Sequence, residues 1–174
     1  MSPSHRRYLL LEQGVGAAVF NFVLNGAIAW LLFRTQDEVP LWGQQSIAGD
    51  TIVTSLLLPL ITCLIVTPMA RRHVRGGRIV PLGWTRETHG ALGWLPRGTV
   101  ARAFVLGLLC MVAISPLTLL GLALLHVATL GMWKFVLFKA SFAAAEALVV
   151  TPLIALWAIA ESETTPASLL RAAR

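Results

Sequence analysis

The sequence predicts an all-α polytopic membrane protein with four transmembrane helices, and three observations carry this prediction. Apolar residues make up 56% of the chain and charged residues only 13%, so a water-soluble domain of this composition would expose large apolar patches. Four apolar stretches reach the roughly 20 residues that a spanning helix needs. The segments between them alternate in charge. We therefore predict one domain, residues 1–174, with spans at 9–33, 51–70, 103–125 and 135–160.

The first span carries a stripe of small and amide side chains. Its members recur every four residues and so share one side of a helix: Gln13, Ala17, Asn21, Asn25 and Ala29. Small residues let helices approach closely, and buried amides hydrogen-bond across helices. We predict that this side faces protein. Two interpretations stay open, helix packing alone or a polar cavity lined by Asn21 and Asn25.

The later spans share one feature, an internal proline, which removes a backbone hydrogen bond and predicts a kink. These prolines are Pro59 and Pro68 in the second span, Pro116 in the third and Pro152 in the fourth. We interpret Asp50 as the cap that starts the second span. Lys139, in the fourth span, is expected to extend toward the nearer membrane surface.

The net charge of +6 follows the predicted topology. Arginines crowd the loop at 71–102 and both chain ends, whereas the loop between the first two spans carries Asp37 and Glu38. The positive-inside rule then places both termini and the loop at 71–102 in the cytoplasm of a bacterial inner membrane. Because the charge follows topology, nucleic acid is not expected as a partner.

The basic loop also offers contacts for lipid headgroups. Arginines near a membrane surface attract anionic lipids, and tryptophan favours the interface. The candidates are Arg71, Arg72, Arg75, Arg78, Trp84 and Trp94. The alternative is that these arginines only set the topology.

Glu146 is the main functional candidate, because an ionisable group inside a span is costly and marks a functional site by default. Desolvation favours its neutral, proton-carrying form. Counting from the nearer interface at about 1.5 Å per residue puts Asn21, Thr62, Ser115 and Glu146 each roughly 18–20 Å along their helices. We predict a polar layer near mid-membrane. Glu146 is then either a structural hydrogen-bonding acid or a proton or cation site.

The cysteines and histidines predict no metal site and no cofactor. Cys63 and Cys110 both fall inside spans and suit a packing role. His73 and His89, in the basic loop, lack a sequence-evident nucleophile, metal partner or carboxylate arrangement. A membrane-surface enzyme that uses them is the least favoured interpretation.

Short motifs connect the two halves of the chain. Val149-Val150-Thr151-Pro152-Leu153 is similar to Ile65-Val66-Thr67-Pro68-Met69, although Pro152-Leu153-Ile154 also matches Pro59-Leu60-Ile61 in a competing register. The run from Asn25-Gly26 through Trp30, with Pro59 and Thr67-Pro68-Met69-Ala70-Arg71-Arg72, resembles a family of small uncharacterised bacterial membrane proteins with two helices per unit.

The second half resembles a diverged copy of the same unit, through Phe138-Lys139-Ala140 and Val150-Thr151-Pro152. This resemblance implies a tandem two-helix hairpin repeat and supplies no catalytic residues. The two hairpins would be parallel and related by an axis along the membrane normal.

Two functions remain after these observations. The favoured one is a non-catalytic accessory or scaffold subunit, with membrane lipids and other membrane subunits or a second copy of the chain as partners. The alternative is a small proton-coupled transporter in which Glu146 exchanges a proton while kinked helices alternate access.

Overall fold

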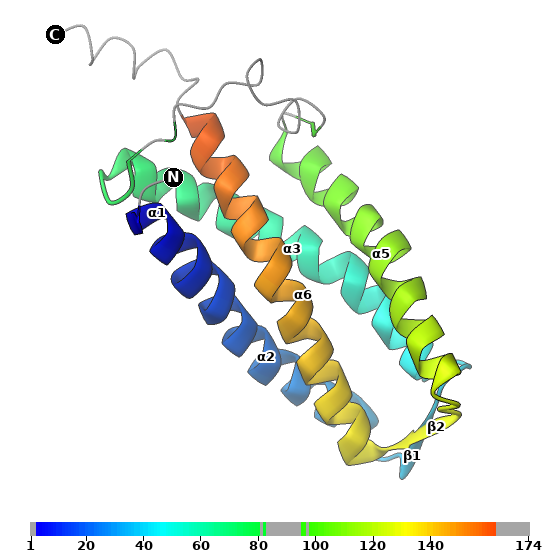
Figure 1. Ribbon diagram of the computed structural model, residues 1–174. Helices are drawn as coiled ribbons and strands as arrows, with labels where there is room; N and C mark the ends of the chain where they lie inside the picture. Colours follow the sequence, from blue (N-terminus) through cyan, green and yellow to red (C-terminus); the bar gives the residue numbers. More distant parts are fainter. Residues whose placement is uncertain (1–2, 81, 83–94, 97, 163–174) are drawn as a thin grey trace, which may run out of the picture.

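The computed structural model describes residues 3–80, 82, 95–96 and 98–162. Four helices in it are long and apolar enough to cross a membrane, which confirms the predicted fold class (Figure 1). They cover Pro3–Phe33, Ile47–Arg75, Thr99–Leu124 and Met132–Glu161. Each begins before its predicted apolar span, and the second extends five residues past it, because polar residues at the membrane surface continue the helical turns.

The first of these helices has three segments. α1, Pro3–Arg7, is followed by the π-helical η1, Tyr8–Val15, and by α2, Gly16–Phe33. Gly14 in η1 lies against α6, because a Cβ at this position would be 3.4 Å from Cγ of Pro152. The missing side chain therefore brings the wide π-helical segment close to its neighbour.

α3, Ile47–Arg75, starts one turn earlier than expected. Its cap is Ser46, whose Oγ accepts a hydrogen bond from the Gly49 N–H at 3.2 Å. Our interpretation of Asp50 as the cap is therefore wrong, since Asp50 lies inside the first turns. A serine oxygen meets the same unpaired N–H groups that an aspartate would have met.

α5, Thr99–Leu124, and α6, Met132–Glu161, form the second half of the described chain. His126, two residues past the end of α5, has a φ of 54° in the left-handed region. The Val127 N–H donates to the Leu122 carbonyl at 3.0 Å, as in a Schellman helix end.

A small sheet joins the two connections at the end of the molecule opposite α1. β1, Glu38–Pro40, pairs antiparallel with β2, Thr129–Gly131, and Val39 faces Leu130 in the register. The pairing holds the first and third connections together. Figure 1 shows α1, the end of α3, the start of α5 and the end of α6 at the other end.

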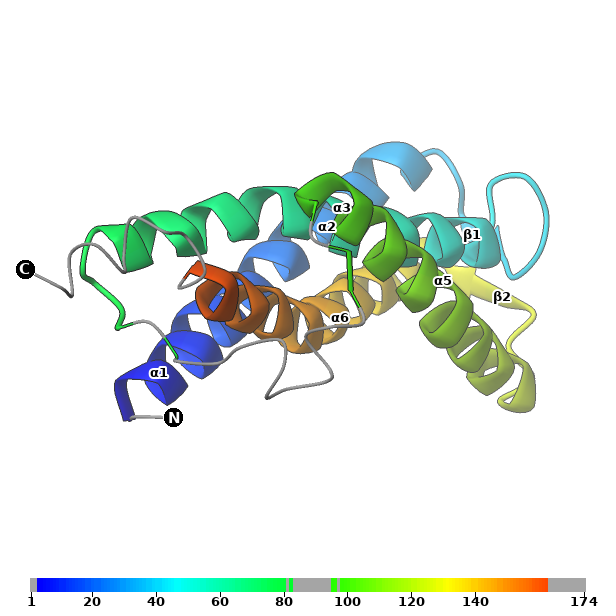
Figure 2. The same ribbon diagram turned by 90° about the horizontal axis from the view of Figure 1, so that it is seen from above.

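The helices pack in the order α2, α6, α3, α5. The extensive helix contacts join α2 to α6, α6 to α3 and α3 to α5. Seen from above in Figure 2, α6 runs alongside both α2 and α3. The two helices of each predicted hairpin are not among these pairs. If the first half (α2 and α3) is exchanged with the second half (α5 and α6), the same pairs of helices remain in contact, as a two-fold axis parallel to the helices requires. The duplication itself stays a prediction.

Three clusters of buried apolar residues stabilise this row. One, near the chain ends, contains Tyr8, Ala70 and Ile159. Another, under the small sheet, contains Phe33, Ile47 and Phe135. Between them Leu58 of α3 packs on Ala143 and Ala147 of α6. The remaining helix faces expose large apolar side chains, as lipid contact requires.

Candidate functional site

Glu146 lies in the middle of α6 and is 4% exposed. Within the part of the chain that the structure describes, neither carboxylate oxygen has a hydrogen-bond partner. The small side chains of Ala143 and Ala147 flank it on the helix, and the Cys110 thiol of α5 lies within electrostatic range. An acid held this way can exchange a proton or bind a cation without first breaking an internal bond.

Three buried hydroxyls also have no hydrogen-bond partner among the described residues. They belong to Ser55 on α3, Ser115 on α5 and Thr151 on α6. The sequence analysis missed Ser55, although Pro59 was a usable signal. A proline frees the carbonyl four residues earlier, and here that residue is Ser55.

The predicted polar layer at one depth is wrong for Ser115. Lys139 pairs with Asp50, and Leu119 packs with Ile47 and Ala48, so Ser115 lies near the first turns of α3. Glu146 lies seven residues beyond Lys139, about 10 Å further along the helix. The prediction failed because α5 extends past the start of α3, which counting from a nominal interface cannot detect.

Asn21 lies near the depth of Glu146, whereas Thr62 lies about one turn further toward the end of α3. Ala17 packs beside Ala143 and Ala147, and a Cβ on Gly26 would be 3.4 Å from the Cβ of Ala140, so Asn21 lies near the level of Glu146. Thr62 is half-buried and lies one turn past Leu58.

The stripe on the first helix is turned toward protein: Gln13 and Ala29 are buried, and Ala17, Asn21 and Asn25 are half-buried. The two asparagines, however, bond within their own helix. Nδ2 of Asn21 donates to the Ala17 carbonyl at 2.9 Å, and Nδ2 of Asn25 donates to the Asn21 carbonyl at 3.1 Å. Our expectation of amide bonds across helices is wrong for these donors, because a carbonyl one turn back is nearer.

Lys139 does not extend to the membrane surface. It is 4% exposed, and its Nζ donates to Oδ1 of Asp50 on α3. The expectation of a surface-seeking lysine is wrong because α3 runs parallel to α6 and offers a carboxylate at this depth. Sequence spacing within α6 gave no sign of the partner.

A second charged cluster lies where α3, α5 and α6 meet near the chain ends. Arg102 is 1% exposed and donates to Glu161 and, from Nη2 at 2.9 Å, to the Pro96 carbonyl. Arg71 pairs with the same glutamate at 3.0 Å. The sequence analysis counted Arg102 only as loop charge.

The lipid-headgroup candidates divide into three groups. Arg71 and Arg78 form ion pairs within the chain, with Glu161 and with Glu12 at 2.9 Å. Arg72 and Arg75 are exposed at the end of α3. Trp84 and Trp94 lie outside the described residues.

The cysteine and histidine side chains considered in the sequence analysis form no evident catalytic group among the described residues. Cys63 is buried and Cys110 half-buried, and both are free thiols. His73 accepts or donates a hydrogen bond at 3.1 Å with the Tyr8 hydroxyl. Across residues 3–80, 82, 95–96 and 98–162, no three His, Cys, Asp or Glu side chains gather as metal ligands.

Comparison with protein-family models, with curated proteins and with solved structures finds no match to this chain. The case for function therefore depends on the packing and the buried charges described above.

Proposed function

We propose that this chain is a non-catalytic integral membrane protein that acts as an accessory or scaffold subunit of a membrane assembly. The observation that carries the proposal is that two buried ion pairs join helices of the row. Lys139 with Asp50 joins α6 to α3 near the start of both helices, and Arg102 with Glu161 joins α5 to α6 near the end of α6. Such pairs fix the relative position of helices, which is what a scaffold requires.

The outermost helix of the row supports the same proposal. In the most apolar 18-residue stretch of the first helix, only 6% of the residues are buried by the rest of the chain. Val19 and Val23 are 60% and 66% exposed on it. This face is available to lipid and to a helix of another subunit or of a second copy.

The proposed location is a bacterial inner membrane, with both termini on the cytoplasmic side. The described chain ends, the end of α3 and the start of α5 share one end of the molecule, which supports an even number of crossings (Figure 1). Arg6 and Arg7 of α1 and Arg71, Arg72 and Arg75 of α3 lie at that end, and the positive-inside rule assigns it to the cytoplasm.

The test is isolation of the protein in mild detergent from the host membrane, with an affinity tag. A scaffold subunit is expected to co-purify with a partner, or with itself, at fixed stoichiometry. Replacing both valines, Val19→Trp and Val23→Trp, should reduce this stoichiometry, while the control Val112→Trp on α5 should not. A monodisperse, partner-free protein would exclude the proposal.

A second candidate function rests on Glu146. Its buried carboxyl has no hydrogen-bond partner among the described residues, which favours proton or cation exchange in a small transporter. Glu146→Gln keeps the shape of the side chain and removes the titrating group. In proteoliposomes this variant should lose proton-coupled uptake, whereas Glu12→Gln, at an exposed position, should retain it. Equal uptake by Glu146→Gln and the native chain would eliminate this mechanism.

A further inference from the structure

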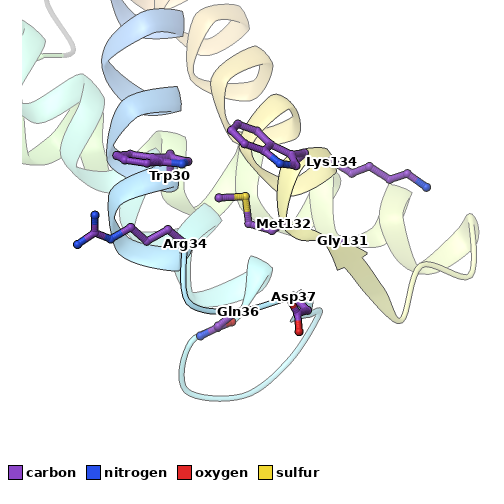
Figure 3. Close-up of a pocket in the computed structure, with 8 residues that line it drawn as sticks. Trp30, Arg34, Gln36, Asp37, Gly131, Met132 and Lys134 are labelled. Atoms are coloured by element: carbon purple, nitrogen blue, oxygen red, sulfur yellow. The ribbon is translucent and has the colours of Figure 1, made fainter.

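A pocket lies between the end of α2 and the start of α6, beside the small sheet. Its volume is about 710 Å³, and residues from both helices and both connections line it. Figure 3 shows Trp30 and Arg34 on α2, Met132 and Lys134 at the start of α6, and Gln36 and Asp37 on the connecting loop. The remaining lining residues are Gly131 and Trp133.

The position of the pocket indicates which molecules surround it. Trp30 lies one turn before α2 ends, and Trp133 is the second residue of α6. Tryptophans at helix ends mark the boundary between headgroups and hydrocarbon. The pocket therefore opens at the level of the phospholipid headgroups.

The charges of the pocket are not neutralised by the chain itself. Arg34 and Lys134 are exposed and, among the residues that the structure describes, form no ion pair. The Arg34 guanidinium carbon lies 5.5 Å from the Trp30 ring centroid. In Figure 3 the long side chains of Arg34 and Lys134 extend away from each other, on opposite sides of the pocket.

Asp37 adds the opposite charge at the same pocket. Its backbone carbonyl accepts a hydrogen bond from the Met132 N–H at 3.0 Å, which fixes the loop against α6. Its side chain is exposed and, in the described chain, has no ion-pair partner. The pocket thus presents two cations, one carboxylate and two indole rings.

We propose that this pocket binds the headgroup of an amine-bearing phospholipid of the phosphatidylethanolamine type. The cations on the two sides of the pocket, Arg34 and Lys134, attract the phosphodiester, and Asp37 and the faces of the indole rings attract the ammonium. A purely anionic headgroup would leave Asp37 without a counter-charge. One bound lipid would join α2 to α6.

The test is native mass spectrometry of the delipidated full chain in detergent, with phosphatidylethanolamine or phosphatidylglycerol added at equal concentration. The native chain should retain phosphatidylethanolamine preferentially. Arg34→Gln with Lys134→Gln should lower this retention roughly thirtyfold, given roughly 1 kcal/mol for each of the two surface cations. The control variants Trp42→Leu and Arg72→Gln change residues outside the pocket and should leave the retention of phosphatidylethanolamine unchanged.

Two further measurements separate the components of the proposal. Asp37→Asn should weaken retention of phosphatidylethanolamine and spare phosphatidylglycerol. Glycerophosphoethanolamine, which is the headgroup without acyl chains, should compete poorly. Equal retention of both lipids by the native chain, no effect of the pocket variants, or full competition by the soluble headgroup would overturn the proposal.

Discussion

Lys139 on α6 donates a hydrogen bond to Asp50 on α3, and this buried ion pair joins the two central helices of the row. Replacing one partner leaves the other charge buried and unpaired. We expect Lys139→Met to lower the free energy of unfolding by about 3–5 kcal/mol. Denaturant titration in mixed micelles measures this loss.

The double variant Asp50→Asn with Lys139→Met tests the cause of that loss. Because both charges are then gone, most of the stability should return. Leu137→Met, at an exposed position of the same helix and outside the pocket, is the control and should have little effect. A double variant no more stable than Lys139→Met would contradict the ion-pair explanation.

The close contact of α5 with α3 depends on Gly107. A Cβ at this position would lie 2.6 Å from the backbone carbonyl oxygen of Leu56, so the helices would have to separate. Gly107→Ala should therefore destabilise the protein by about 1–3 kcal/mol. Gly121→Ala is a matched control on the same helix, since a Cβ there meets nothing within 4 Å. Equal loss in both variants would refute the steric argument.

Glu161 allows a comparison of buried and exposed ion pairs. Glu161→Gln leaves Arg102, which is almost fully buried, without its carboxylate and should cost about 3 kcal/mol of stability. Glu12→Gln breaks the pair with Arg78, in which the side chains are 44% and 59% exposed, and should cost less than about 1 kcal/mol. Thermal unfolding of both variants in one detergent measures the difference, and similar losses would argue against the role of burial.

His126 is strained by its left-handed backbone conformation. His126→Gly removes the Cβ clash and should raise stability by about 0.5–1 kcal/mol. His126→Ala keeps the Cβ and serves as the control, with no gain expected. Stabilisation by alanine equal to that by glycine would show that the imidazole, and not the backbone, is the source of strain.

The predicted orientation is checked by cysteine labelling in a Cys63→Ala, Cys110→Ala background. Gln44 and Arg72 are both exposed and lie at opposite ends of α3, Gln44 just before its first residue and Arg72 in its last turn. An impermeant maleimide should label Gln44→Cys in intact cells and Arg72→Cys only after permeabilisation. The reverse pattern would invert the positive-inside assignment.

The number of helices and the inward face of the first one were predictable from local pattern. Apolar length specifies a spanning helix, and a four-residue period specifies which side of it is polar. The order of packing was not predictable, because four apolar helices present similar faces to one another. Asp50 is the partner of Lys139 because α3 packs beside α6, so it could not be predicted without the packing order.

In the candidate site, too, the residues marked by local sequence were predictable and those that depend on packing were not. Glu146 was identified because one carboxyl inside a span is visible in the sequence. Ser55 was missed because a serine in an apolar helix is unremarkable until its burial is known. The common depth of Ser115 and Glu146 failed because depth depends on where each helix lies along its neighbours.

The pairing of α2 with α6 has a consequence for biosynthesis. α2 leaves the ribosome before its main partner α6, with α3 and α5 between them, so a nascent chain that has inserted α2, α3 and α5 but not α6 still exposes Asn21 and Asn25 to lipid. Insertion and final assembly are thus separate events. A truncation that removes α6 is expected to leave an inserted but unassembled chain, a substrate for membrane proteases.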